Sequence, residues 1–254
     1  MSYFRQLRLP IGRLSDTPYV VVDTETTGLN PDIDRVVEVA ALRFESGRVT
    51  DRFESLIDPG RDIPAEASEQ HHLLYEDLEG SPPLEAVEDE LADFVGEDLV
   101  VAHNARFDRA FLPCLESKTW VCSQRAARHQ WPHAKKHRNQ FLRYWLKLDG
   151  AGIRSAAAHR AGGDAIVTGH IFHRELIEYE VAHPDASMDD FMRHVESPVV
   201  VTRLPFGKHR GQLIADVPIS YLQWAIRNMI DLDPDVRFAI ESQIDRHFGI
   251  EDAA

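Results

Sequence analysis

The sequence places acidic residues with catalytic potential where an apolar run ends. Asp23 and Glu25 follow the β-branched run 19–22 and are separated by one residue. On a strand, both side chains therefore leave the same face. Adjacent carboxylates repel each other unless a cation lies between them, and their hard oxygen atoms suit Mg²⁺ or Mn²⁺. The pair predicts a divalent-metal site at the end of a buried strand, although an isolated Asp-x-Glu pair is weak support by itself.

Two further segments combine a histidine with an acid. His103 and Asp108 follow the apolar run 99–102, and Asp108 falls in the first turn of an expected helix. An acid at that position also stabilises a helix N-terminus, so a structural role stays open. His159 and Asp164 are five residues apart and cannot share a helix face, so we expect His159 on a loop and Asp164 inside the next helix.

Apolar runs and periodic stretches predict the elements that position these side chains. Strands are expected at 19–22, 36–44, 48–57 and 99–102, the first three forming a meander. Helices are expected at 64–74, 83–95, 105–117, 122–130, 138–148 and 163–181. Strands followed by interleaved helices indicate an α/β fold, with a mixed sheet flanked by helices.

Composition indicates two folded parts. A main domain is expected over 15–181, a polar linker over 182–198 and a small C-terminal module over 199–250. The module contains the glycine-bounded turn 206–211, which presents Lys208 and Arg210 as candidate phosphate contacts. A folding turn with solvated charges is the alternative.

The net charge of the chain is −14, from 28 Lys and Arg against 42 Asp and Glu. Such a charge ordinarily argues against a polyanionic partner, because nucleic-acid binding neutralises phosphates with Lys and Arg. The basic residues are concentrated, however: residues 120–160 contain nine Lys or Arg and one acid. Nucleic-acid binding is therefore not excluded, and we expect it to be salt-sensitive and confined to a basic flank and a metal-filled cleft.

Cysteine usage and hydropathy bear on location. Two cysteines, Cys114 and Cys122, are too few for a secreted disulfide framework. Residues 1–10 lack the apolar run of a signal peptide, and no window is long and apolar enough to span a membrane. We expect a cytoplasmic protein without a membrane partner; its oligomeric state is not readable from the sequence.

Taken together, DTETTGL from Asp23, HNARFD from His103 and HRAGGD from His159 resemble the three motifs of the DnaQ-like (DEDDh) 3′→5′ exonuclease family, which has a ribonuclease H-like fold. The resemblance covers about residues 17–178. It implies four metal-site acids (Asp23, Glu25, Asp108 and Asp164), two Mg²⁺ or Mn²⁺ ions, and His159 as the catalytic histidine. The substrate contacts it implies are Thr26, Thr27, Gly28, His103, Asn104, Phe107 and Arg160.

A narrower likeness, to the exodeoxyribonuclease X group of this family, rests on residues 120–123 and 128–132 and on the tail segments 204–211 and 221–224. It implies degradation of DNA 3′ ends, single-stranded and duplex, to nucleoside 5′-monophosphates in repair or recombination. The alternatives are an RNA-trimming exonuclease and a polymerase-associated binding subunit with weak nuclease activity. Gly162 and Gly163 depart from the family pattern and, since each costs about 1 kcal/mol in a helix, are expected to loosen the loop that carries His159.

Overall fold

A computed structural model describes residues 12–150 and 152–249 of the chain. The chain divides between Val195 and Glu196 into an N-terminal and a C-terminal unit. Residues 1–10, where no signal peptide is expected, and residue 250, the expected end of the small module, lie outside the described part. Within that part, no helix combines the length and apolar character needed to cross a membrane.

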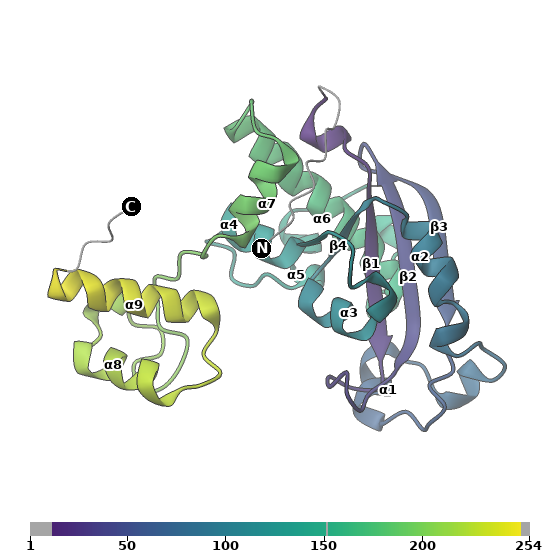
Figure 1. The fold of residues 1–254 in the computed structure, drawn as a ribbon, viewed down its shortest axis with the longest axis horizontal. Helices are drawn as coiled ribbons and strands as arrows, with labels where there is room; N and C mark the ends of the chain where they lie inside the picture. The colour runs from purple at the N-terminus through teal and green to yellow at the C-terminus, as the bar shows by residue number, and fades with distance from the viewer. Residues whose placement is uncertain (1–11, 151, 250–254) are drawn as a thin grey trace. The chain divides into compact units, whose positions relative to one another are not determined.

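The N-terminal unit is built on a five-stranded mixed sheet with the order β3-β2-β1-β4-β5 (Figure 1). The strands are β1 (Tyr19–Thr26), β2 (Val36–Glu45), β3 (Arg48–Leu56), β4 (Leu99–Ala102) and β5 (Trp120–Cys122). The first three pair antiparallel as a meander, whereas β4 pairs parallel with β1 and β5 pairs parallel with β4. The predicted mixed sheet and its meander are confirmed, and β5 is a strand that the sequence analysis missed.

The helices of the N-terminal unit follow the meander. They are α1 (Ala65–His71), α2 (Glu88–Val95), α3 (Ala105–Phe111), α4 (Ser123–Gln130), α5 (Asn139–Trp145), α6 (Ala161–Ala182) and α7 (Met188–Glu196). Short 3₁₀ helices lie at Leu14–Asp16, Tyr75–Leu78, Leu84–Ala86, Pro113–Leu115 and Ile153–Ser155. The expected helices therefore form, several of them shorter than predicted.

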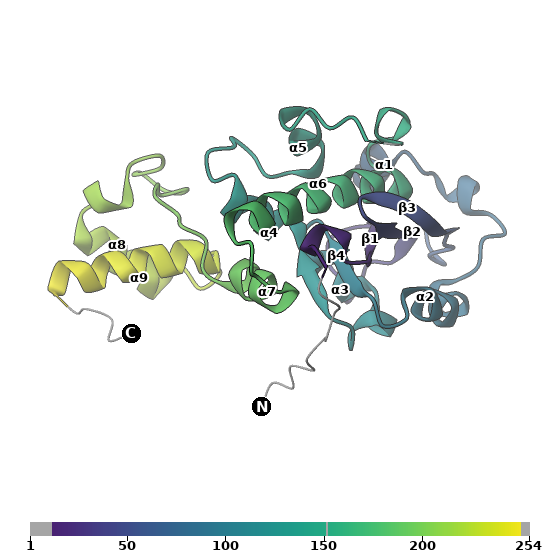
Figure 2. The same ribbon diagram turned by 90° about the horizontal axis from the view of Figure 1, so that it is seen from above.

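Helices cover both faces of the sheet (Figure 2). Side chains alternate along β1, so Tyr19 enters the core shared with α4, α6 and α7, and Val20 enters the core shared with α2 and α3. Asp23 and Glu25 continue the series that begins at Tyr19, whereas Thr24 belongs to the other series. The two carboxylates consequently emerge on the face that α6 covers.

The stretch 182–198, predicted to be a linker, contains helix α7. Met188, Phe191, Met192 and Val195 recur at helical spacing and are buried in the core that α6 also joins. The remaining residues of α7 are mostly polar, so the mean composition concealed an amphipathic helix. The linker prediction is therefore wrong for these residues.

The C-terminal unit has its own small core. It contains a 3₁₀ helix (Ile214–Asp216), α8 (Ile219–Asn228) and α9 (Pro234–Phe248). Its buried apolar residues are Leu204, Ile214, Val217, Leu222, Ala225, Val236 and Ile240. An isolated antiparallel bridge between Arg203 and Leu213 brings together the two ends of the segment that contains the glycine-bounded turn.

Candidate active site

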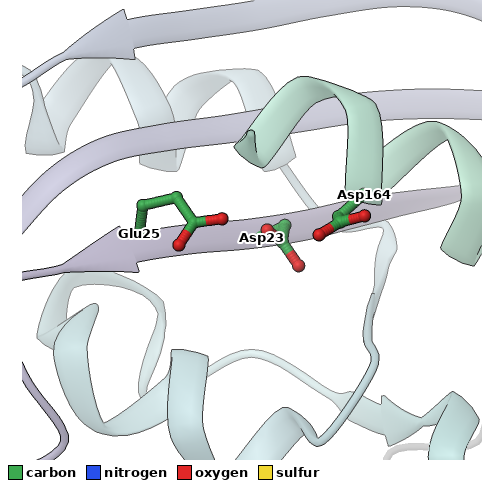
Figure 3. Close-up of side chains that lie close together, drawn as sticks. All are labelled: Asp23, Glu25 and Asp164. Atoms are coloured by element: carbon green, nitrogen blue, oxygen red, sulfur yellow. The ribbon is translucent and has the colours of Figure 1, made fainter. Parts of the chain in front are cut away.

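Three carboxylates from β1 and α6 form a compact cluster (Figure 3). Asp23, Glu25 and Asp164 each offer an oxygen atom, and these atoms lie within 4.8 Å of one another. Strand alternation places the first two on one face, and the first turn of α6 brings Asp164 over that face. Clustered carboxylate oxygens are the donor set that hard divalent cations such as Mg²⁺ and Mn²⁺ prefer, so the residues fit the expected metal.

Asp108 approaches β1 from α3 and does not join the three-carboxylate cluster. β4 pairs with β1 only from Tyr19 to Val21, which leaves the following β1 edge open. Oδ1 of Asp108 accepts hydrogen bonds there from the backbone N–H of Thr24 (3.0 Å) and from its hydroxyl (2.9 Å). Asp108 is 3% exposed, so this carboxyl is fixed against the strand that carries two of the cluster acids.

Burial and mutual repulsion disfavour the charged forms of these acids. Burial, followed by the nearby carboxyls, raises the pKa of Asp23 well above its ordinary value. Burial and Asp164 raise the pKa of Glu25 to about 8, and burial raises that of Asp108 to about 7 despite its hydrogen bonds from Thr24. The pKa of Asp164 is also raised by burial. A divalent cation among the cluster would favour the carboxylate forms, because opposite charge stabilises them.

His159 lies on an exposed loop immediately before α6, as predicted. Its backbone is left-handed (φ 58°), and its N–H donates to Oδ2 of Asp164 at 3.1 Å. A Cβ atom on Gly163 would lie 2.0 Å from the carbonyl oxygen of Ala157. Gly163 therefore allows the loop to pack directly on α6, so the loosening expected from this glycine is replaced by close contact.

The region that carries these residues matches a known family: residues 20–172 match the Exonuclease family, RNase_T. The match spans more than half of the chain. The chain belongs to the exonuclease family. The resemblance drawn from the three motifs is thus confirmed, and this exonuclease is an enzyme of the class expected from its sequence.

Relatives of this exonuclease extend the comparison. Exodeoxyribonuclease 10 of Escherichia coli (strain K12) is 28% identical over 229 residues, which cover 89% of this chain and 98% of that protein. The PolC-type DNA polymerase III of Thermotoga maritima is 32% identical over 168 residues, 63% of this chain but 12% of the polymerase. A structure of exonuclease X in complex with 5′-overhanging duplex DNA aligns with a TM-score of 0.57 and 26% identity, over 70% of this chain and 99% of that one. Residues 194–229 match a second family, described as "Putative quorum-sensing-regulated virulence factor".

The predicted substrate contacts after β1 form a closed turn. Thr26 donates its hydroxyl to the carbonyl oxygen of Gly28 (2.6 Å), and Thr27 donates to Oδ1 of Asp34 (3.2 Å). A Cβ atom on Gly28 would lie 2.5 Å from the Asp34 carboxyl. The turn is therefore fixed by internal bonds. Its contact with substrate stays a prediction.

Other predicted contacts already have protein partners. Arg160 donates from Nε and Nη2 to the carboxylate of Glu38, and the N–H of Ala161 donates to the same group at 2.9 Å. This ion pair fastens the start of α6 to β2. Asn104 caps α3 with a left-handed backbone (φ 81°), and Phe107 packs on Phe111 with ring centroids 4.9 Å apart. Lys208 and Arg210 belong to the C-terminal unit.

Gln140 of α5 is a residue that the sequence analysis missed. Its amide donates to Oδ1 of Asp164, while Nδ2 of the neighbouring Asn139 donates to the Asp164 carbonyl oxygen at 3.0 Å. Nη1 of Arg143 donates to Oε1 of Gln140 (3.2 Å), which fixes the orientation of the amide. No sequence motif indicates this role, because only the fold brings α5 next to Asp164.

Gln140→Ala is expected to reduce nuclease activity about 10- to 100-fold, since residues that orient a metal ligand have effects of that size. The unfolding midpoint should change little, because the side chain is only partly buried. Initial rates at several Mg²⁺ concentrations test this: the loss should shrink as Mg²⁺ rises. Gln124→Ala, on α4, is the matched control, and a rate for Gln140→Ala equal to that of wild type would contradict the role.

His103, the first residue of the second motif, belongs to a buried hydrogen-bond chain. Its Nε2 faces the carbonyl oxygen of His137 at 2.7 Å, so Nε2 must carry the proton. Nδ1 then carries no proton and lies 3.4 Å from Oγ of Ser123. Burial lowers the pKa of His103 to about 4, in agreement with a neutral ring.

The hydrogen-bond chain that begins at His103 ends at Glu175 of α6, which is 1% exposed. Its Oε1 accepts a hydrogen bond from the hydroxyl of Ser123 at 3.2 Å. Burial raises the pKa of Glu175 well above its ordinary value despite this bond, which favours the protonated acid. These contacts connect α6 through Ser123 to the segment that contains His103 and Asp108.

We expect Glu175→Gln to preserve the fold and to weaken the pH dependence of stability. With a raised folded-state pKa, the contribution of Glu175 is fully present below the unfolded pKa, near 4.3, and is lost as pH rises through the folded pKa. The neutral amide has no proton to lose. Thermal unfolding in EDTA should therefore show a smaller fall in midpoint from pH 5 to pH 8 than in wild type. The exposed Glu85→Gln is the control, and an unchanged pH profile for Glu175→Gln would contradict the protonated assignment.

Proposed function

We propose that this exonuclease removes nucleotides from the 3′ ends of DNA in a reaction that depends on two divalent cations, Mg²⁺ or Mn²⁺. The proposal rests chiefly on the partly buried carboxylate cluster of Asp23, Glu25 and Asp164 at the end of β1 in a chain of the exonuclease family. DNA is favoured as substrate by the similarity to exodeoxyribonuclease 10 over nearly its whole length.

The cluster residues would hold the cations. Asp23, Glu25 and Asp164 would be direct ligands, and Asp108 would act on the second ion directly or through water. When bound, the cations supply positive charge that activates a water molecule and stabilises the departing 3′-oxygen.

His159 is the group that would accept the proton of the attacking water. Two observations support this role: the His159 residue is exposed, and its backbone N–H donates to Oδ2 of Asp164, which ties the loop that carries it to the cluster. Histidine is the side chain that most often acts as a general base, because a neutral imidazole can accept a proton in the transition state. The products would be nucleoside 5′-monophosphates released from the 3′ end.

Digestion of matched oligonucleotides tests the proposal. Single-stranded DNA, blunt duplex DNA and RNA of one sequence, each labelled once at the 3′ end and once at the 5′ end, are incubated with Mg²⁺, Mn²⁺ or EDTA. We expect the 3′ label to be released first as a mononucleotide, with DNA degraded faster than RNA and no reaction in EDTA. Faster degradation of RNA would favour an RNA-trimming enzyme. Tight DNA binding with little cleavage would favour a polymerase-associated subunit.

A further inference from the structure

The C-terminal unit exposes an aromatic surface beside its glycine-bounded turn. Tyr221 and Trp224 lie one helical turn apart on α8, with ring centroids 5.4 Å apart, and Trp224 is 49% exposed. An open hollow of about 540 Å³ is lined by these two rings and by Lys208, His209, Pro218 and Ser220. The lining includes a cation and no acidic residue.

The turn and α8 are packed into one surface. Gly207 has a left-handed backbone (φ 64°), and a Cβ atom there would lie 2.1 Å from the hydroxyl oxygen of Tyr221. The close approach places the Lys208 ammonium 5.4 Å from the centre of the Tyr221 ring and sets the His209 ring edge-on to it, at 4.7 Å. The cation and the aromatic rings are therefore held together by the fold of this unit.

Charge in this part of the chain has the sign that a polyanion requires. Residues 199–230 contain four Lys or Arg and one acid, Asp216, although the whole chain carries a net charge of −14. Exposed aromatic faces next to cations are suited to single-stranded nucleic acid, because unpaired bases stack on the rings while phosphates approach the cations. A duplex keeps its bases stacked internally and cannot use the ring faces in this way.

We propose that Trp224, Tyr221 and Lys208 form a binding site for single-stranded nucleic acid, separate from the carboxylate cluster. The site extends the proposed function by giving the chain a second contact with its substrate strand, but its occupancy requires no cleavage. It also assigns a ligand to the aromatic rings of the tail segment 221–224, to which the sequence analysis gave no role.

The test measures binding by the full chain in EDTA, where the carboxylate cluster lacks cations and repels phosphate. The probe is a fluorescein-labelled 20-nucleotide oligo-dT, followed by anisotropy at low salt. One base stacked on an aromatic ring corresponds to about 5- to 100-fold in affinity, so Trp224→Ala should weaken binding by that factor. Trp224→Phe, which retains a ring, should lose less.

Phe238→Ala provides the matched control, since Phe238 is 48% exposed and lies on α9 of the same unit, outside the hollow. It should leave the affinity for oligo-dT unchanged, and unfolding curves should show that all variants remain folded. Equal affinities for wild type and Trp224→Ala would overturn the site. A similar loss in the affinity for a blunt duplex, or in Phe238→Ala, would overturn the stacking assignment. A chain that binds oligo-dT in this way but cleaves nothing in Mg²⁺ would contradict the proposed function and leave this site standing.

Discussion

Asp23→Asn is expected to abolish 3′-end hydrolysis in Mg²⁺ and, in EDTA, to raise the midpoint of thermal unfolding. The activity should fall by well over the ~100-fold typical of residues that merely orient a ligand, because the change removes a carboxylate from the cluster itself. Stability should rise because burial and neighbouring acids make the charge of Asp23 costly to the folded chain.

The direction of the Asp23 pKa shift determines how this gain in stability depends on pH. The folded-state pKa of Asp23 is raised, so its contribution to stability is lost as pH rises from the unfolded pKa, near 3.9, through the folded one. The neutral amide avoids that loss. The difference in midpoint between Asp23→Asn and wild type should therefore be small near pH 4 and larger at pH 8.

The exposed Asp93→Asn, on α2, carries the same chemical change away from the cluster and should alter neither activity nor midpoint. Purified Asp23→Asn with wild-type activity would refute the assignment of the cluster as the catalytic site. A lower midpoint in EDTA would show that the Asp23 carboxylate contributes to folding rather than opposing it.

The sequence predicted those parts of the site that depend on strand alternation and on residue order. Asp23 and Glu25 had to share a face once 19–22 was taken as a strand, and the polar helix starts located Asp108 and Asp164. The sequence did not show that Asp108 has different surroundings from the other three acids. Asp108 stands apart from the cluster because β4 ends early and exposes the N–H of Thr24, a consequence of strand pairing that no local pattern contains.

The misses have related causes. Gln140 and Glu175 acquire their roles through contacts with Asp164 and Ser123, each more than twenty residues away in sequence. Helix α7 was missed because polar residues dominate its composition, although its apolar residues recur at helical spacing. Strand β5 has only three residues, and it lies in a basic segment that the sequence analysis interpreted by its charge. Average composition therefore gives a wrong prediction where a short helix or strand buries only one of its faces.

His159→Asn is expected to lower the rate of 3′-end hydrolysis by about 10²- to 10⁴-fold, the usual contribution of a general base. Asn is the appropriate replacement because His159 has a left-handed backbone (φ 58°), which Asn tolerates better than Ala or Gln. The hydrogen bond from its backbone N–H to Asp164 can then persist. The loss should consequently fall on kcat, with unchanged binding of Mn²⁺ in calorimetry.

The control for this variant is His72→Asn, since His72 is also an exposed histidine with a left-handed backbone (φ 61°) in the same unit. It should retain wild-type kcat. Equal losses of kcat in the two variants, or a loss of Mn²⁺ binding in His159→Asn, would contradict a general-base role, because a base acts on the attacking water and leaves the carboxylate cluster intact.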